Sequence, residues 1–104
     1  MEFKENARGY KVLSFEDITS AKCSMQESSA IEPAIWIGID HPIPKLFLPD
    51  VDKEKKGWID YPVPDCVKIF GRMELNQQQV KDLLPYLKYF ADNGELPREE
   101  LKGE

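Results

Sequence analysis

The sequence predicts an α+β fold in which an antiparallel β-sheet of four to six strands packs against one C-terminal amphipathic helix. Three observations lead to this prediction: short segments rich in β-branched and aromatic residues, turn residues between them, and one long stretch with helical periodicity near the C-terminus. Because 104 residues with 41% hydrophobic side chains are enough for one compact core, we expect a single domain spanning residues 1–104. Its ordered core is expected at about residues 10–96, between flexible termini.

Short apolar segments predict the strands. Residues 34–39, AIWIGI, form a continuous apolar run between Pro33 and Asp40, which is typical of a central strand covered on both faces. Residues 45–48 lie between two prolines, which favour an edge strand or a ribbon, and the charged residues 50–57 are typical of a hairpin tip. Further strands are expected at residues 10–15, 23–30, 58–61 and 67–75, after a frayed start at residues 1–9.

One helix is expected at residues 77–92. Asn76 is in position to cap its N-terminus, and Gly94 follows its end as a left-handed cap. Apolar residues recur on one face of this helix at Val80, Leu83, Leu84, Leu87 and Phe90, and we expect that face to pack on the sheet. Pro85 lies outside this stripe, so a bend there would wrap the helix around the sheet.

The charge of the chain argues against two classes of partner. A formal net charge of −5 and a pI near 4.9 do not suit duplex DNA, since affinity for DNA comes mostly from Lys and Arg side chains on phosphates. No apolar run reaches the length of a membrane span, and residues 1–6 are charged where a signal peptide is apolar. We therefore expect a cytoplasmic protein with no membrane partner.

The residues that commonly carry catalysis are scattered. His41 is the only histidine, and a Cys-His pair would have to recruit Cys23 or Cys66 from distant parts of the sequence. The same scattering disfavours a zinc site. Carboxylates next to turns, where they ordinarily cap backbone amides, are Asp17, Asp40, Asp60 and Asp65. The sequence thus predicts no catalytic residue, no metal site and no cofactor, with a small hydrolase using Cys23 or carboxylates as the weakest alternative.

The stretch CSMQESSA at residues 23–30 is the better candidate for a contact surface. In a strand, Ser24, Gln26 and Ser28 share one face, where they can donate and accept hydrogen bonds. The predicted ligand- or partner-binding residues are Lys22, Ser24, Gln26, Ser28, Trp36 and Arg72, in which the two cations suit an anionic group. The alternative is that the hydroxyls only satisfy local backbone groups at an edge strand.

Several phrases occur in a fixed order along the chain. They are CSMQESS at residues 23–29, IWIG at 35–38, GWIDYPVP at 57–64, RMEL at 72–75, Gln79-Val80, Pro85 and Gly94-Glu95. In this order they resemble a family of small proteins encoded by bacteriophages and prophages. The chain departs from the family pattern at Met25 and Ile37, where leucine is usual, at Asn76, where threonine is usual, and at Glu74, where histidine is frequent.

The resemblance implies a phage-encoded accessory protein that acts in the cytoplasm of the bacterial host, and it supplies no activity or catalytic residue. We expect a non-enzymatic inhibitor that binds a component of a host bacterial defence. The alternative is an oligomeric sponge that sequesters a nucleotide-type immune signal. The expected partners are a bacterial host protein or a small nucleotide ligand, and further copies of the chain, because apolar residues such as Phe70 are left on the outer side of the sheet.

Overall fold

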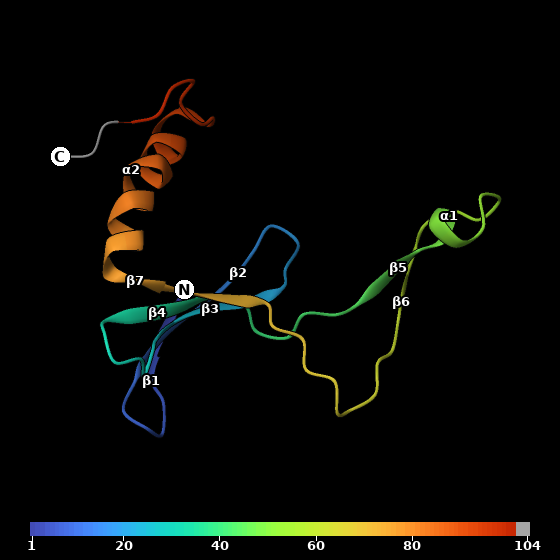
Figure 1. Cartoon of the computed structure of the whole chain (residues 1–104), viewed down its shortest axis with the longest axis horizontal. Helices are drawn as coiled ribbons and strands as arrows, with labels where there is room; N and C mark the ends of the chain where they lie inside the picture. Colours follow the sequence, from blue (N-terminus) through green and yellow to red (C-terminus); the bar gives the residue numbers. More distant parts are fainter. Residues whose placement is uncertain (102–104) are drawn as a thin grey trace.

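The computed structural model describes residues 1–101 and has three parts, a five-stranded sheet, a two-stranded arm and a C-terminal helix (Figure 1). The sheet contains β1 (Glu2–Glu5), β2 (Lys11–Glu16), β3 (Lys22–Glu27), β4 (Ala34–Ile39) and β7 (Arg72–Asn76). The arm contains β5 (Lys45–Phe47), α1 (Leu48–Val51) and β6 (Trp58–Asp60), and the helix is α2 (Gln77–Asn93). The predicted α+β class is confirmed, with a sheet of the predicted size.

The five-stranded sheet is an antiparallel meander with one insertion. Its strand order is β1-β2-β3-β4-β7, so consecutive strands are neighbours until the arm separates β4 from β7 in the sequence. In the register, Val12, Gln26, Trp36 and Glu74 lie side by side across four strands. The central strand is therefore β3, which carries the CSMQE part of the polar stretch.

Alternation of side chains gives this sheet two different faces. The polar face carries two rows of residues that are paired across β2, β3, β4 and β7. The first row is Val12, Gln26, Trp36 and Glu74, and the second is Ser14, Ser24, Gly38 and Arg72. The apolar face carries Leu13, Phe15, Cys23, Met25, Ile35, Ile37, Ile39, Met73 and Leu75. A shift of register by one residue would exchange the two faces, so the pairing of β3 with its neighbours fixes both.

Three expectations about the strands are wrong. Residues 2–5 form β1 rather than a frayed start, because their backbone pairs with residues 11–14 of β2. The last strand begins at Arg72 instead of residue 67. The internal strand β4 is not covered on both faces, since all its residues keep intermediate exposure.

The arm matches the predicted hairpin over residues 45–60. β5 pairs with β6, and the rings of Phe47 and Trp58 lie 4.7 Å apart between their centroids. Lys45 Nζ and Asp60 Oδ1 form an ion pair of 2.5 Å on the same ribbon. The predicted charged tip is present, and it begins with the single helical turn α1. The arm extends away from the five-stranded sheet (Figure 1), which leaves Trp58 largely exposed.

The ends of α2 are capped as the sequence predicts. Gln79 N donates to Asn76 Oδ1 at 2.8 Å and Asn76 N donates to Gln79 Oε1 at 2.9 Å, a reciprocal capping box. Gly94, with a φ of 75°, ends the helix by donating its N–H to Phe90 O at 2.7 Å.

The expectation that α2 packs on the sheet is wrong within one chain. Leu84, Leu87 and Phe90 are 58%, 64% and 54% exposed. Gln77 of α2 directly follows Asn76 of β7, so no linker exists that would let the helix turn back over the sheet. Figure 1 shows α2 standing away from the strands, with β7 as the strand it contacts.

Little of the chain is buried. Within residues 1–101 only Val12, Cys23 and Ser24 are buried, all of them in β2 and β3. The Cα radius of gyration is 17.8 Å, whereas a compact domain of this length has about 13 Å. A single copy therefore has a hydrogen-bonded sheet but no full hydrophobic core.

We predict that Gly38→Ala destabilises the sheet. Gly38 has a φ of +146°, and an added Cβ would lie 2.2 Å from the Gly71 carbonyl oxygen. Strain and overpacking together should lower the free energy of unfolding by about 2–5 kcal/mol in a denaturant titration. The matched control is Gly57→Ala, which has a φ of +93° and open space around the added Cβ. The Gly57→Ala variant should lose about 1–2 kcal/mol of its free energy of unfolding. Equal losses in the two variants would contradict the close approach of Gly38 to the Gly71 carbonyl oxygen.

Candidate binding site

Ser24 and Asp40 form the most buried polar pair of the sheet. Ser24 is 3% exposed, and its Oγ donates to Asp40 Oδ1 at 2.5 Å. Asp40 is held in turn by its own backbone, because Asp40 N donates to Lys22 O at 2.9 Å. A hydrogen bond to a carboxylate is stronger than one between neutral groups, so this pair fixes the end of β4 against β3.

Arg72 is placed over the same face by its pairing with Gly38 across β4 and β7. Its guanidinium carbon lies 5.9 Å from the centroid of the Trp36 ring, within range of a cation–π interaction. Arg72 Nη1 also donates to Gln26 Oε1 in a long hydrogen bond of 3.5 Å. Trp36 and Gln26 are neighbours in the register, so three strands hold the guanidinium above the sheet.

A hollow of about 340 Å³ lies beside this arginine. We call it the polar concavity, and it is lined by Lys4, Asn6, Val12, Ser14, Ser24, Gln26, Asp40, His41 and Arg72. Lys4 and Arg72 bring two positive charges to a wall that holds one carboxylate, Asp40. The concavity is thus locally positive in a chain whose formal net charge is −5.

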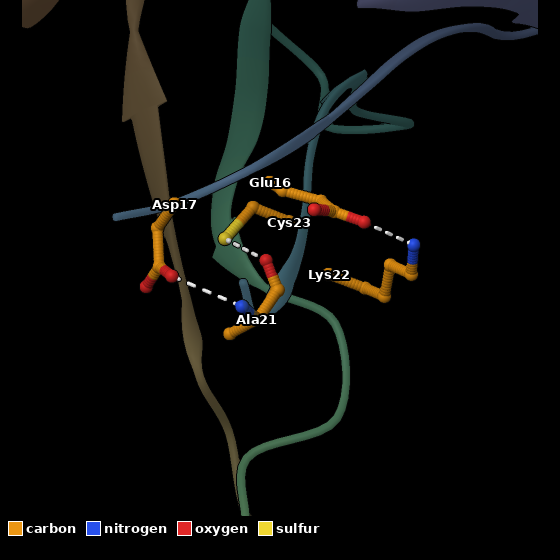
Figure 2. A network of polar contacts seen from close by, with 5 residues as sticks. All are labelled: Glu16, Asp17, Ala21, Lys22 and Cys23. Atoms are coloured by element: carbon orange, nitrogen blue, oxygen red, sulfur yellow. Dashed lines mark hydrogen bonds and ion pairs between the residues drawn. The ribbon is translucent and has the colours of Figure 1, made fainter. Parts of the chain in front are cut away.

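The six predicted binding residues all lie on the side of the sheet that carries Ser24, and the structure divides them into two groups. Ser24, Gln26 and Arg72 line the polar concavity, and Trp36 supports Arg72 from below. Lys22 and Ser28 are not brought to it. The Lys22 ammonium pairs with Glu16, as Figure 2 shows, and the Ser28 hydroxyl donates to Glu74 Oε2.

Sequence reasoning missed part of the lining. The place of Ser14 in the lining can be derived from the alternation of side chains along β2, once the pairing of β2 with β3 is known. Lys4 and Asn6 carry no such signal, because β1 is a short charged segment without an apolar pattern. The sequence indicates a turn at Asp40 and His41, and this turn reaches the concavity because β4 ends beside β3.

The turn between β2 and β3 is organised by one carboxylate (Figure 2). Asp17 Oδ1 accepts hydrogen bonds from Thr19 N at 2.8 Å and Thr19 Oγ1 at 2.6 Å. It also accepts one from Ala21 N at 3.0 Å, which Figure 2 shows. The Thr19 hydroxyl and the Ala21 amide lower the pKa of Asp17, since they stabilise its charged form. This is the capping role predicted for a carboxylate beside a turn, and it leaves Asp17 engaged in the scaffold.

The Cys23 thiol and the Lys22 ammonium lie next to this turn and also belong to the scaffold. Cys23 is 4% exposed, with its Sγ 3.5 Å from Ala21 O (Figure 2). Burial, followed by the negative charge of Asp17, raises the pKa of the Cys23 thiol, so the reactive thiolate is disfavoured. The Glu16 carboxylate raises the pKa of Lys22 by hydrogen bonding and by its charge. Neither Cys23 nor Lys22 is therefore available for chemistry in the polar concavity.

Within residues 1–101, no group of three or more His, Cys, Asp or Glu side chains is arranged to hold a metal ion. Neither helix in this range is long and apolar enough to cross a membrane.

Comparisons with protein-family models, curated proteins and solved structures find no match. The resemblance to phage proteins therefore stays a prediction from the sequence phrases.

We predict that Cys66 reacts with a thiol reagent in the native protein and that Cys23 does not. Cys66 is exposed, whereas Cys23 is buried and has a raised pKa. Titration with Ellman's reagent at neutral pH, followed by peptide mass mapping, should find label on Cys66 alone until denaturant is added. Cys66→Ser should remove the native reaction altogether. Fast native labelling of Cys23 would contradict its assignment as a buried scaffold residue.

Proposed function

We propose that the chain is a non-enzymatic binding protein of the phage accessory type that inhibits a host bacterial defence by capturing one of its components in the polar concavity. The observation that carries this proposal is Arg72, held over Trp36 and against Gln26 at a locally positive hollow. Arginine in a fixed position is well suited to anions, because its planar group donates several parallel hydrogen bonds.

The two candidate nucleophiles, the Ser24 hydroxyl and the Cys23 thiol, are both buried, which favours binding over catalysis. The Ser24 hydroxyl is buried and donates to Asp40 instead of to an imidazole, so His41 does not act on it as a base. The Cys23 thiol is buried, and burial raises its pKa, which disfavours the thiolate. What remains accessible around the concavity is a set of hydrogen-bond donors and acceptors on rigid strands.

A nucleotide-type signal is the component that the chemistry of the concavity favours. Phosphate oxygens suit Arg72 and Lys4, while Asn6, Ser14 and Gln26 offer hydrogen bonds to a sugar or a base edge. A volume of about 340 Å³ is at the small end of ligand sites and suits one nucleotide unit.

A host protein is the second candidate, and the arm favours it. Trp58, Ile59 and Tyr61 are exposed on a ribbon that projects from the sheet (Figure 1). Exposed aromatic and aliphatic side chains on a projecting ribbon are common at protein interaction sites.

We predict that Arg72→Gln weakens nucleotide capture by about 10–100-fold, the loss expected for a charged hydrogen bond. A thermal-shift screen of the wild type with mononucleotides, cyclic dinucleotides and ADP-ribose derivatives should first find a ligand that raises the melting temperature. Arg8→Gln is the matched control, because Arg8 also lies over an aromatic ring, 5.5 Å from the Tyr10 centroid, but outside the concavity. Gln26→Ala should weaken the same ligand without lowering stability.

Two results would count against this function. If none of these ligands shifts the wild-type melting temperature, nucleotide capture is wrong, and mass spectrometry of proteins recovered with the chain from its host tests the second candidate. If Arg8→Gln and Arg72→Gln lose affinity equally, the ligand does not bind in the polar concavity.

A further inference from the structure

One copy of the chain leaves two complementary apolar surfaces uncovered. The first is the α2 stripe, which consists of Val80, Leu83, Leu84, Leu87 and Phe90. The second is the apolar face of the sheet, on which Met73 is 58% exposed and Leu13, Met25 and Ile37 keep intermediate exposure. An amphipathic helix and a flat apolar sheet are the two layers that normally cover each other in α+β domains.

The accessible area of the chain is far larger than that of a folded monomer. It is 9206 Å², whereas a compact monomer of 12.0 kDa has about 6,000 Å². The excess is about 3,200 Å² per copy, or about 6,400 Å² for two copies, which is more than the roughly 2,000–5,000 Å² in total that obligate homodimers commonly bury. A stable native state therefore requires a partner that covers a large part of each copy.

The segment after Gly94 contacts the side of α2 opposite the stripe. Leu101 N donates to Tyr86 Oη at 3.0 Å, which ties the segment after Gly94 back to the helix. Pro85 and Tyr86 line a hollow together with Leu101 on this side. The large hydrophobic side chains of α2 that are exposed, Leu83, Leu84, Leu87 and Phe90, all belong to the α2 stripe.

We propose that a second copy of this chain covers both surfaces, with the α2 stripe of each copy packed on the apolar face of the other. Since α2 begins directly after β7, the helix of one copy does not lie on its own sheet, and a second copy supplies the missing layer. A reciprocal exchange about a twofold axis covers both surfaces in both copies at once. A different protein would have to present a helix and a sheet in matching positions.

The dimensions of the two surfaces agree. From Val80 to Phe90 the stripe is about 15 Å long at 1.5 Å per residue. The five strands span about 19 Å from first to last at their usual spacing of about 4.8 Å. A helix laid across the sheet would therefore contact three or four strands. The polar concavity lies on the opposite face, so this association leaves the proposed ligand site open.

Light scattering after size-exclusion chromatography tests the association with the full chain. The wild type should have at least twice the 12.0 kDa mass of one chain. Leu87→Glu should shift the mass toward one chain, because it places a charge in the interface. Gln78→Glu adds the same charge on the opposite side of α2 and should leave the mass unchanged. A wild type of 12.0 kDa that unfolds cooperatively overturns the proposal.

Cross-linking tests which surfaces meet, even if Leu87→Glu fails to fold. Chains carrying Leu87→Cys are mixed with chains carrying Met25→Cys, both with Cys66→Ser, and are treated with a short bismaleimide. A cross-linked dimer of the two different chains is expected. Replacing Leu87→Cys by Gln78→Cys should abolish it. An oligomer in which Gln78→Cys links as well as Leu87→Cys, or in which neither links, overturns the proposed pairing of α2 with the apolar face.

Discussion

The alternation of side chains along β3 is the constraint on which the rest of the structure depends. β3 is the middle strand, and each of its residues faces one side only: Cys23 and Met25 the apolar face, Ser24 and Gln26 the polar face. The buried pair of Ser24 with Asp40 holds this register at the end of β4. Both candidate surfaces of the molecule follow from that single register.

The two faces have different chemistry and are suited to different partners. The polar face gathers Arg72, Gln26 and Lys4 around a hollow, and the proposed capture of an anion rests on this arrangement. The apolar face and α2 expose apolar side chains to water, which is unfavourable. In the proposed dimer a second copy supplies the layer of protein that covers them. Separation of the two on opposite sides of one sheet allows a copy to associate and to bind a ligand at the same time.

Local signals were read correctly from the sequence, whereas long-range placement was not. The caps at Asn76 and Gly94 depend on neighbouring residues, so sequence spacing predicts them. The position of Lys4 depends on β1, whose four residues carry no apolar pattern and are placed by pairing with β2. The predicted bounds, a strand to residue 75 and a helix from residue 77, already leave no linker between β7 and α2, but helical periodicity alone does not give the direction of α2. Of the candidate site, Ser24, Gln26, Trp36 and Arg72 were therefore predictable, and its full lining was not.

The central claim is that the native state is completed between copies, and the concentration dependence of stability tests it most directly. A chain stabilised by a second copy becomes more stable as protein concentration rises, by mass action. Over about a hundredfold range of concentration, the midpoint of thermal unfolding should rise by about 5–10 °C. A cooperative transition with the same midpoint at every concentration would contradict the account, because it would mean that one copy is stable alone.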